Sequence, residues 1–249
     1  MFDLTGRVAI VTGGNGGIGL GMARGLASAG ARVVVAARNA EKSRAALAEL
    51  GSDAFALAAD VCDERSVEAM LGEAVRRCGR LDILVNNAGT NVRKPAHELS
   101  LAEWREVLDT NLTGAFLCSR GAYPHLKRAG GGKIINIGSM LSIFGASFAP
   151  AYGASKGGMV QLTKSLATTW AQDNIQVNAV LPGWIDTDLT RKAREQVAGL
   201  NERVLARTPA GRWGRIDDMA GVAVFLASAA SDFITGAAIP VDGGYSTLV

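Results

Sequence analysis

Tyr152 and Lys156 are four residues apart in a segment of helical character, so their side chains are expected on one face of the helix. A free tyrosine titrates at a pKa of about 10, which is too high for efficient proton exchange at neutral pH. A neighbouring ammonium favours the phenolate and lowers that pKa. The pair could therefore protonate a carbonyl oxygen during a reduction, or accept a hydroxyl proton during an oxidation.

Two further polar residues could complete such a site. Ser139 follows the predicted strand Lys133–Gly138, and ligands gather at the carboxyl ends of strands in open α/β sheets. Its hydroxyl could therefore hold a substrate oxygen beside Tyr152. Asn111 lies inside a long helical segment, where it is a poor helix former, and its amide could hold a water. Each of these residues alone is compatible with a structural role, and a Tyr–Lys pair at this spacing also arises by chance.

The glycine-rich run Thr12–Gly19 (TGGNGGIG) joins the first predicted strand to the first predicted helix. Glycines let a backbone turn sharply and approach a pyrophosphate, and the N-terminus of the following helix offers N–H groups to the anion. A tight turn that binds nothing is the structural alternative. The position between a strand and a helix favours dinucleotide binding.

The second predicted strand ends in Ala37-Arg38, with no acidic residue where an adenosine ribose would be read. The planar fork of arginine can bind a 2′-phosphate, whereas an acidic residue would repel it. The sequence therefore favours NADP(H) over NAD(H). A solvated arginine at the strand end would leave that choice open.

Short apolar runs alternate with longer helical stretches along the chain. The predicted strands are Arg7–Thr12, Arg32–Ala37, Ala54–Ala59, Leu81–Val85, Lys133–Gly138, Ile175–Leu181 and Ala237–Val241. The predicted helices are Gly17–Ala29, Asn39–Leu50, Asp63–Cys78, Ser100–Ala129, Ala151–Gln172 and Asp217–Ala229. No linker divides the chain. This alternation predicts one doubly wound, Rossmann-type α/β domain over residues 1–249, with a mostly parallel sheet of seven strands.

Composition excludes several classes of protein. The net charge of +3, without a basic run, argues against nucleic-acid binding. There is no signal peptide and no apolar run of about 18 residues, so we expect no membrane span and a cytoplasmic location. Cys62, Cys78 and Cys118 lack metal-type spacing and are expected to be reduced, buried or half-buried thiols. No metal site is expected.

These motifs together resemble the classical short-chain dehydrogenases/reductases. The resemblance spans about Leu4 to Tyr245. It rests on a set of motifs in the family's order, namely Thr12–Gly19, Asp60-Val61, Asn86-Asn87-Ala88-Gly89, Asn111, Ser139, Tyr152-Gly153-Ala154-Ser155-Lys156, and Pro182-Gly183 followed by Thr187. The reaction implied is the reversible conversion of a secondary alcohol to a ketone with NADP⁺ or NAD⁺, in a homotetramer.

The resemblance also implies roles for single residues. Tyr152 would be the general acid/base, and Lys156 would lower its pKa and hold the nicotinamide ribose. Ser139 would orient the substrate carbonyl, and Asn111 would hold a water in a proton relay to Lys156. The implied cofactor contacts are Gly13, Asn15, Gly16, Gly17, Ile18, Gly19, Arg38, Asp60, Val61, Asn87, Ala88, Gly89, Tyr152, Lys156, Pro182, Gly183, Ile185 and Thr187.

Two stretches resemble the sugar-acid dehydrogenases that act on gluconate-type or 2-deoxygluconate-type substrates. They are Ser139–Ser142 (SMLS) and Arg207–Gly214 (RTPAGRWG). The expected substrate lid, about 186–215, is rich in basic residues, which are Arg191, Lys192, Arg194, Arg203, Arg207, Arg212 and Arg215. A basic lid could attract a carboxylate. A solvated helix face is the preferred interpretation for most of these residues.

Other residues near the expected cleft leave alternatives open. Arg93 and His97 follow the fourth predicted strand and could be functional or solvated; Phe144, Phe148 and Trp184 could line the pocket or belong to the core or an interface. A 3-oxoacyl-carrier-protein reductase and a small-ketone carbonyl reductase are alternative enzymes. A cofactor sensor or scaffold is the non-enzymatic alternative, although such proteins usually lack the tyrosine or the lysine.

Overall fold

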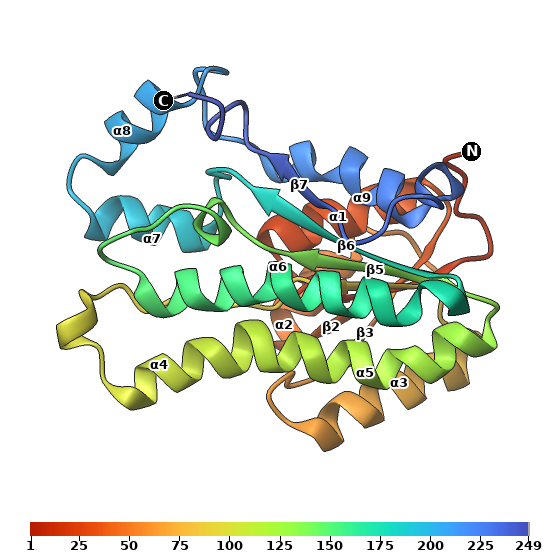
Figure 1. Cartoon of the computed structure of the whole chain (residues 1–249). Coiled ribbons are helices and arrows are strands. Elements are labelled where there is room, and N and C mark those ends of the chain that lie inside the picture. The colour runs from red at the N-terminus through yellow and green to blue at the C-terminus, as the bar shows by residue number, and fades with distance from the viewer. Residues whose placement is uncertain (249) are drawn as a thin grey trace.

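The computed structural model describes residues 1–248, which form one seven-stranded sheet with helices on both faces (Figure 1). The strands are β1 (Val8–Thr12), β2 (Arg32–Ala37), β3 (Phe55–Ala58), β4 (Ile83–Asn86), β5 (Gly132–Ile137), β6 (Ile175–Pro182) and β7 (Ala238–Val241). Their order is β3-β2-β1-β4-β5-β6-β7, and every pair is parallel. The predicted doubly wound fold is confirmed, with a sheet that is parallel throughout.

The helices pack in two layers. They are α1 (Gly17–Ser28), α2 (Ala40–Leu47), α3 (Glu64–Cys78), α4 (Leu101–Leu108), α5 (Gly114–Arg128), α6 (Pro150–Trp170), α7 (Asp188–Gln196), α8 (Leu200–Arg207) and α9 (Ala220–Ala227). Buried residues of α1, α2 and α9 form one core against the sheet, and those of α3, α5 and α6 form the other (Figure 1). Because both faces are covered, β1, β4 and β6 are buried along their whole length and read as continuous apolar runs.

The winding of the sheet reverses between β1 and β4, and ligands bind in the crevice at such a point. Asn87 fixes the two strand ends there. Its Nδ2 donates to the carbonyl oxygens of Thr12 (3.0 Å) and Gly13 (3.1 Å), while the Thr12 hydroxyl accepts from the backbone N–H groups of Asn87 and Ala88. The glycine turn is thus anchored to the end of β4.

The predicted helical segment Ser100–Ala129 is confirmed, but it contains a break in its hydrogen-bond pattern. Ser100 and Glu103 form the capping box that begins α4, and a π-helical turn, Asp109–Thr113, separates α4 from α5. Asn111 lies in that turn. Since π-turns inside helices often mark functional sites, the interruption is consistent with a special role for this residue.

The structure differs from the sequence analysis in the exposure of one cysteine and in two helices that were not predicted. Cys62 is exposed rather than buried or half-buried, because it lies in the surface turn between β3 and α3. The stretch 186–215 contains α7 and α8, which share a small apolar cluster of their own.

No helix in residues 1–248 is both long and apolar enough to cross a membrane.

Candidate active site

Ser139, Tyr152 and Lys156 meet at the carboxyl end of β5. Ser139 begins the 3₁₀ turn Met140–Ser142, and Tyr152 and Lys156 lie in the first two turns of α6. The Lys156 ammonium is 5.5 Å from the centre of the Tyr152 ring and donates to the Ile137 carbonyl at 2.7 Å. Ser139 and Tyr152 line a cavity of about 710 Å³. The structure therefore brings these predicted residues together.

The electrostatics of the pair differ from the sequence expectation. Burial raises the pKa of Tyr152, and the Ser139 hydroxyl and the positive charge of Arg93 act in the opposite direction. Burial also lowers the pKa of Lys156 to about 8. Desolvation therefore outweighs charge for the pKa of Tyr152 in this structure, and the cation that acts on the phenol is Arg93; the expected lowering by Lys156 stays a prediction.

Asn111 is fully buried, and its amide is engaged. Its Oδ1 accepts from the Thr90 backbone N–H at 2.8 Å, and its Nδ2 donates to the Thr90 carbonyl and the Ser155 hydroxyl, both at 3.0 Å. Both N–H groups of the amide are therefore used in joining the loop after β4 to α6. The expected role of this amide in holding a water stays a prediction.

The glycine turn fits an anionic phosphate group. Gly13 (φ 63°) and Gly17 (φ 53°) adopt left-handed conformations that other residues rarely take. Gly16 precedes α1 without any side-chain cap, and the first turn of α1 contains no acidic residue. A Cβ atom on Gly19 would lie 2.4 Å from Asn87 Nδ2. Backbone N–H groups at the start of α1 are therefore available for a pyrophosphate.

The predicted adenosine-side residues lie around this turn. Arg38 is exposed directly after β2. The amide of Asn15 donates to the Asn39 carbonyl and the Ser43 hydroxyl, which ties the turn to α2. Asp60 accepts from the Cys62 backbone N–H after β3. Asn15 and Asp60 therefore have structural partners in addition to any contact with a cofactor.

The remaining predicted cofactor residues lie close to the catalytic residues or beside the glycine turn. Val61 is buried in contact range of Gly114, and Gly89 lies next to Asn111. Several of the others line the same cavity as Tyr152, namely Ile18, Pro182, Gly183, Ile185 and Thr187. The Thr187 methyl group would be 3.3 Å from a Cβ on Gly17. One cavity thus extends from the glycine turn to Tyr152.

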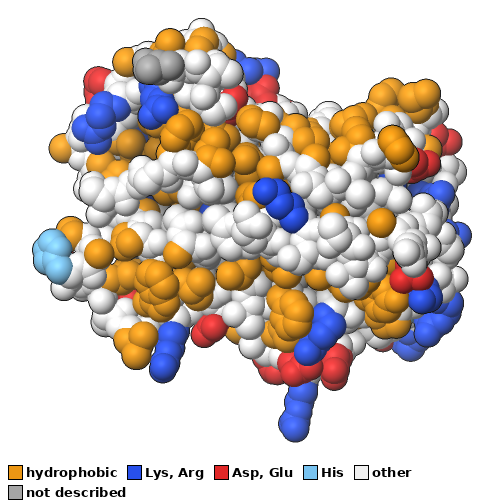
Figure 2. Space-filling view, viewed as in Figure 1, with side chains coloured by type: hydrophobic (Ala, Val, Ile, Leu, Met, Phe, Trp, Pro, Cys, Tyr) orange, Lys and Arg blue, Asp and Glu red, His pale blue; other side chains and the backbone are white. Residues whose placement is uncertain are grey.

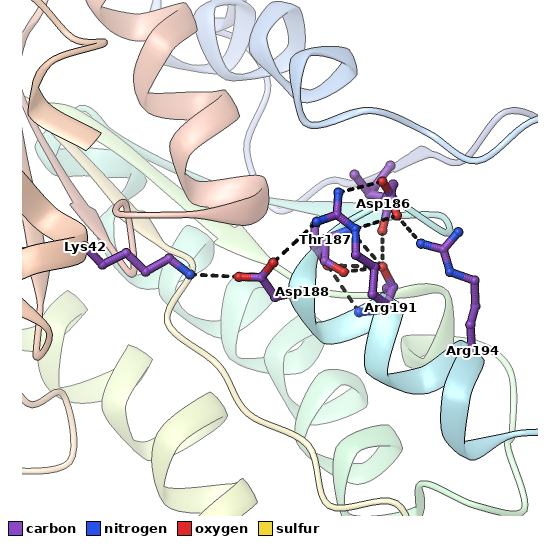
Figure 3. Close-up of polar contacts among 8 residues, drawn as sticks. Lys42, Asp186, Thr187, Asp188, Arg191 and Arg194 are labelled. Carbon is purple, nitrogen blue, oxygen red and sulfur yellow. Dashed lines mark hydrogen bonds and ion pairs between the residues drawn. The ribbon is translucent and has the colours of Figure 1, made fainter. Parts of the chain in front are cut away.

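Ion pairs organise the start of the lid (Figure 3). Asp186 pairs with Arg191 at 2.9 Å and also with Arg194. Asp188 pairs with Lys42 at 3.0 Å and with Arg191 at 3.6 Å. Two of the seven basic lid residues, Arg191 and Arg194, therefore have acidic partners within the lid.

Three arginines line the cavity: Arg93, Arg203 and Arg207. Arg93 donates from Nη2 to the Leu189 carbonyl at 2.9 Å and from Nη1 to Gln196 at 3.2 Å, which ties α7 to the loop after β4. No aspartate or glutamate of the described chain lines this cavity. Figure 2 shows Lys and Arg side chains on the lobe that carries α8 and the C-terminal segment. The cavity is therefore positively charged.

The Arg207 guanidinium lies against two aromatic rings, with its central carbon 4.7 Å from the Phe144 ring centre and 4.6 Å from that of Tyr245. Its Nε is buried without a hydrogen-bond partner in the described chain, as is that of Arg93. The structure places three aromatic residues in the lining of the cavity, which is the first of the two positions considered for them: Phe144, Phe148 and Trp184. His97 is largely exposed and does not line it.

Comparison with known proteins decides the family. A family model described as "Enoyl-(Acyl carrier protein) reductase" matches residues 13–246. A 2-dehydro-3-deoxy-D-gluconate 5-dehydrogenase from Escherichia coli is 43% identical over 246 residues, covering 98% of this chain and 97% of that protein. The chain belongs to the short-chain dehydrogenase/reductase family. It is an NAD(P)-dependent oxidoreductase that acts on a CH–OH group, as the sequence predicted.

Two further similarities extend over whole chains. A cis-4-hydroxycyclohexanecarboxylate dehydrogenase from Sinomonas cyclohexanicum is 43% identical over 249 residues, covering 97% of each chain. The crystal structure of a gluconate 5-dehydrogenase from Burkholderia cenocepacia, in complex with NADP and tartrate, superposes with a TM-score of 0.93 at 41% identity, covering 100% of this chain and 98% of that one.

The cavity residues that the sequence analysis did not identify include Asn91 and Tyr245 of this short-chain dehydrogenase/reductase. Asn91 lies two residues before Arg93, and its Oδ1 is buried without a hydrogen-bond partner in the described chain. Its position just beyond the carboxyl end of β4 is the signal that could have revealed it. Tyr245 comes from the C-terminal segment, and no sequence pattern connects it to the site.

Proposed function

We propose that this short-chain dehydrogenase/reductase interconverts a secondary alcohol and a ketone on a sugar acid or a related hydroxy acid, with NADP(H) as its preferred cofactor. The observation that carries the proposal is the cavity beside Tyr152, which is lined by three arginines and by no carboxylate in the described chain. An unpaired, half-buried guanidinium is costly unless an anion reaches it, and a carboxylate matches its fork. The tartrate bound to the Burkholderia enzyme is itself a hydroxy acid.

The names of the relatives support a particular spacing between carboxylate and reacting carbon. Oxidation at C5 of a gluconate and at C4 of cyclohexanecarboxylate both take place four bonds from the carboxyl carbon. We propose that this chain accepts the same spacing. The polar group of Asn91 would then meet a hydroxyl between the two ends of an open-chain substrate.

We propose catalytic roles for the residues beside the cavity, which the family resemblance implies and their positions support. During oxidation, the Tyr152 phenolate accepts the proton of the substrate hydroxyl while Ser139 donates a hydrogen bond to the same oxygen. During reduction, Tyr152 returns the proton to the carbonyl oxygen. The Lys156 ammonium donates to the Ile137 carbonyl at the end of β5. The Asn111 side chain accepts from the Thr90 backbone N–H and so fixes the loop after β4. The nicotinamide, when bound, accepts or donates the hydride.

A substrate panel with both cofactors tests the proposal. We expect the highest kcat/KM for a 5-hydroxy sugar acid with NADP⁺. The matching carboxamide should lose about tenfold or more, because it lacks the negative charge and the second acceptor oxygen with which a carboxylate pairs with a guanidinium. Acyl thioesters and simple ketones test the alternative reductases. A preference for either of them over the hydroxy acid would contradict the proposed substrate class.

Arg38→Ala is expected to weaken NADP(H) binding by about tenfold or more and to leave NAD(H) binding nearly unchanged. The reason is that NADP(H) alone carries the 2′-phosphate that this arginine would bind. Equilibrium titration with NADPH and NADH measures both affinities. Equal losses for the two cofactors would count against the assignment of Arg38.

Arg93→Met is expected to move the rise of alcohol oxidation to higher pH. The positive charge of Arg93 acts to lower the pKa of Tyr152, so its removal raises that pKa, and the phenolate that oxidation needs then forms only at higher pH. Arg93→Lys is the matched control, because it keeps the charge while disturbing the bonds to α7. A pH–rate profile that moves equally in both variants would argue that the lid contacts, and not the charge, set the profile.

The family resemblance also leads us to propose a homotetramer, and the cytoplasmic location stays a prediction. Leu101, Trp104 and Phe116 place exposed apolar side chains on α4 and α5, and Figure 2 shows apolar groups over the part of the surface where these helices lie. Burial of such groups between copies would be favourable. Light scattering measures the assembly, and a monomer at micromolar concentration would contradict the proposal.

A further inference from the structure

Lys42 and Asp188 form an ion pair between two segments that are 146 residues apart in the sequence. Lys42 lies in the first turn of α2, beside the glycine turn, and Asp188 is the first residue of α7, the first helix of the lid. Their charged groups are 3.0 Å apart and face each other across the space between these helices (Figure 3). The pair therefore joins the adenosine side of the cleft to the lid.

The Lys42 side chain lies directly over Gly16. A Cβ atom on that glycine would be 2.6 Å from Lys42 Cε and 2.9 Å from its Nζ. The φ angle of Gly16 is 177°, which is extended backbone that any residue adopts. Conformation therefore does not require glycine at position 16. The atoms that such a Cβ would meet all belong to the flexible end of the Lys42 side chain, so the contact shows only that this ammonium lies against the glycine turn.

Lys42 is also close in sequence to Arg38, the residue proposed to bind the 2′-phosphate on the ribose of the cofactor. Arg38 directly follows β2. The Asn39 side chain caps α2 by accepting from the Lys42 backbone N–H at 2.9 Å, so Lys42 lies in the first turn of that helix. One short segment thus carries two exposed cations, and one of them, Lys42, reaches the glycine turn. The side chains of Lys42 and Asp188 are 48% and 70% exposed, and ion pairs this exposed contribute little to stability. Fold stability therefore does not account for this arrangement.

We propose that Lys42 is the second cation for the 2′-phosphate of NADP(H), and that it exchanges Asp188 for this phosphate when the cofactor binds. The proposal rests on the NADP(H) preference proposed above. A phosphate carries up to two negative charges and three acceptor oxygens, so it competes well against one exposed carboxylate. NAD(H) offers only a hydroxyl at this position and leaves the pair with Asp188 intact.

Titration of NADPH and NADH fluorescence, without substrate, tests the role of Lys42. We expect Lys42→Met to weaken NADPH binding by about tenfold and to change NADH binding less than twofold. Arg44→Met is the matched control, because Arg44 is an exposed cation of the same helix. It should change neither affinity. An unchanged NADPH affinity in Lys42→Met would overturn the proposal, and so would equal losses for both cofactors, which would place the ammonium on the pyrophosphate.

A second variant tests the exchange itself. Asp188→Asn removes the competing carboxylate, and we expect it to tighten NADPH binding by about two- to fourfold while NADH binding stays the same. Weaker NADPH binding would instead mean that Asp188 and the phosphate share the lysine, which would overturn the exchange. Wild-type protein that binds NADH as tightly as NADPH would contradict the proposed cofactor preference, a result separate from any effect of Lys42.

Discussion

Tyr152→Phe should reduce turnover by about 10³-fold while leaving the affinity for NADP(H) within twofold of the wild-type value. The substitution removes only the hydroxyl that exchanges the proton, and general acid–base groups contribute on the order of 10²–10⁴ in rate. The ring itself remains next to the Lys156 ammonium. Stopped-flow turnover and NADPH titration measure the two quantities.

Ser139→Ala provides the comparison for this experiment. It removes a hydrogen bond to the substrate oxygen and leaves the proton donor in place, so we expect a smaller loss with the same pH dependence. Near-wild-type turnover in Tyr152→Phe would refute the proposed mechanism. A loss of cofactor affinity equal to the loss of turnover would show that the phenol acts in binding rather than in proton transfer.

Arg207→Met should lower kcat/KM for a sugar acid by about 30-fold, which corresponds to about 2 kcal/mol. The guanidinium is held against the Phe144 and Tyr245 rings, and its buried Nε has no hydrogen-bond partner in the described chain. Its position is therefore fixed before a carboxylate arrives, and less conformational entropy is lost on binding. Kinetics with the acid and with its carboxamide measure the effect.

Arg203→Met is the matched control, since Arg203 belongs to the same helix and lines the same cavity without such ring contacts. We expect a loss of less than fivefold for the acid. The carboxamide should be converted by Arg207→Met at nearly the wild-type rate. If the acid and the carboxamide suffered equally, Arg207 would be supporting the shape of the pocket and not binding a carboxylate.

Much of the fold was accessible from local sequence patterns. Helix Asp63–Cys78 and strand Arg32–Ala37 were placed within one residue of their observed bounds, because an N-capping aspartate and a β-branched run act over a few residues. The π-helical turn around Asn111 was not anticipated. The partners of the Asn111 side chain in that turn are Thr90 and Ser155, which are distant in sequence.

The sequence by itself determined which chemical groups are present and in what order: the glycine turn, Arg38, Asn111, Ser139, and Tyr152 with Lys156 on one helix face. Tertiary structure alone decided the electrostatic environment and the contacts of these groups. Arg93 acts on Tyr152, Arg207 is held by Phe144 and Tyr245, and Lys42 meets Asp188. These contacts join residues that are 38 to 146 positions apart, and no local period specifies them. They form because the parallel sheet brings the carboxyl ends of its strands, and the loops that follow, to one edge.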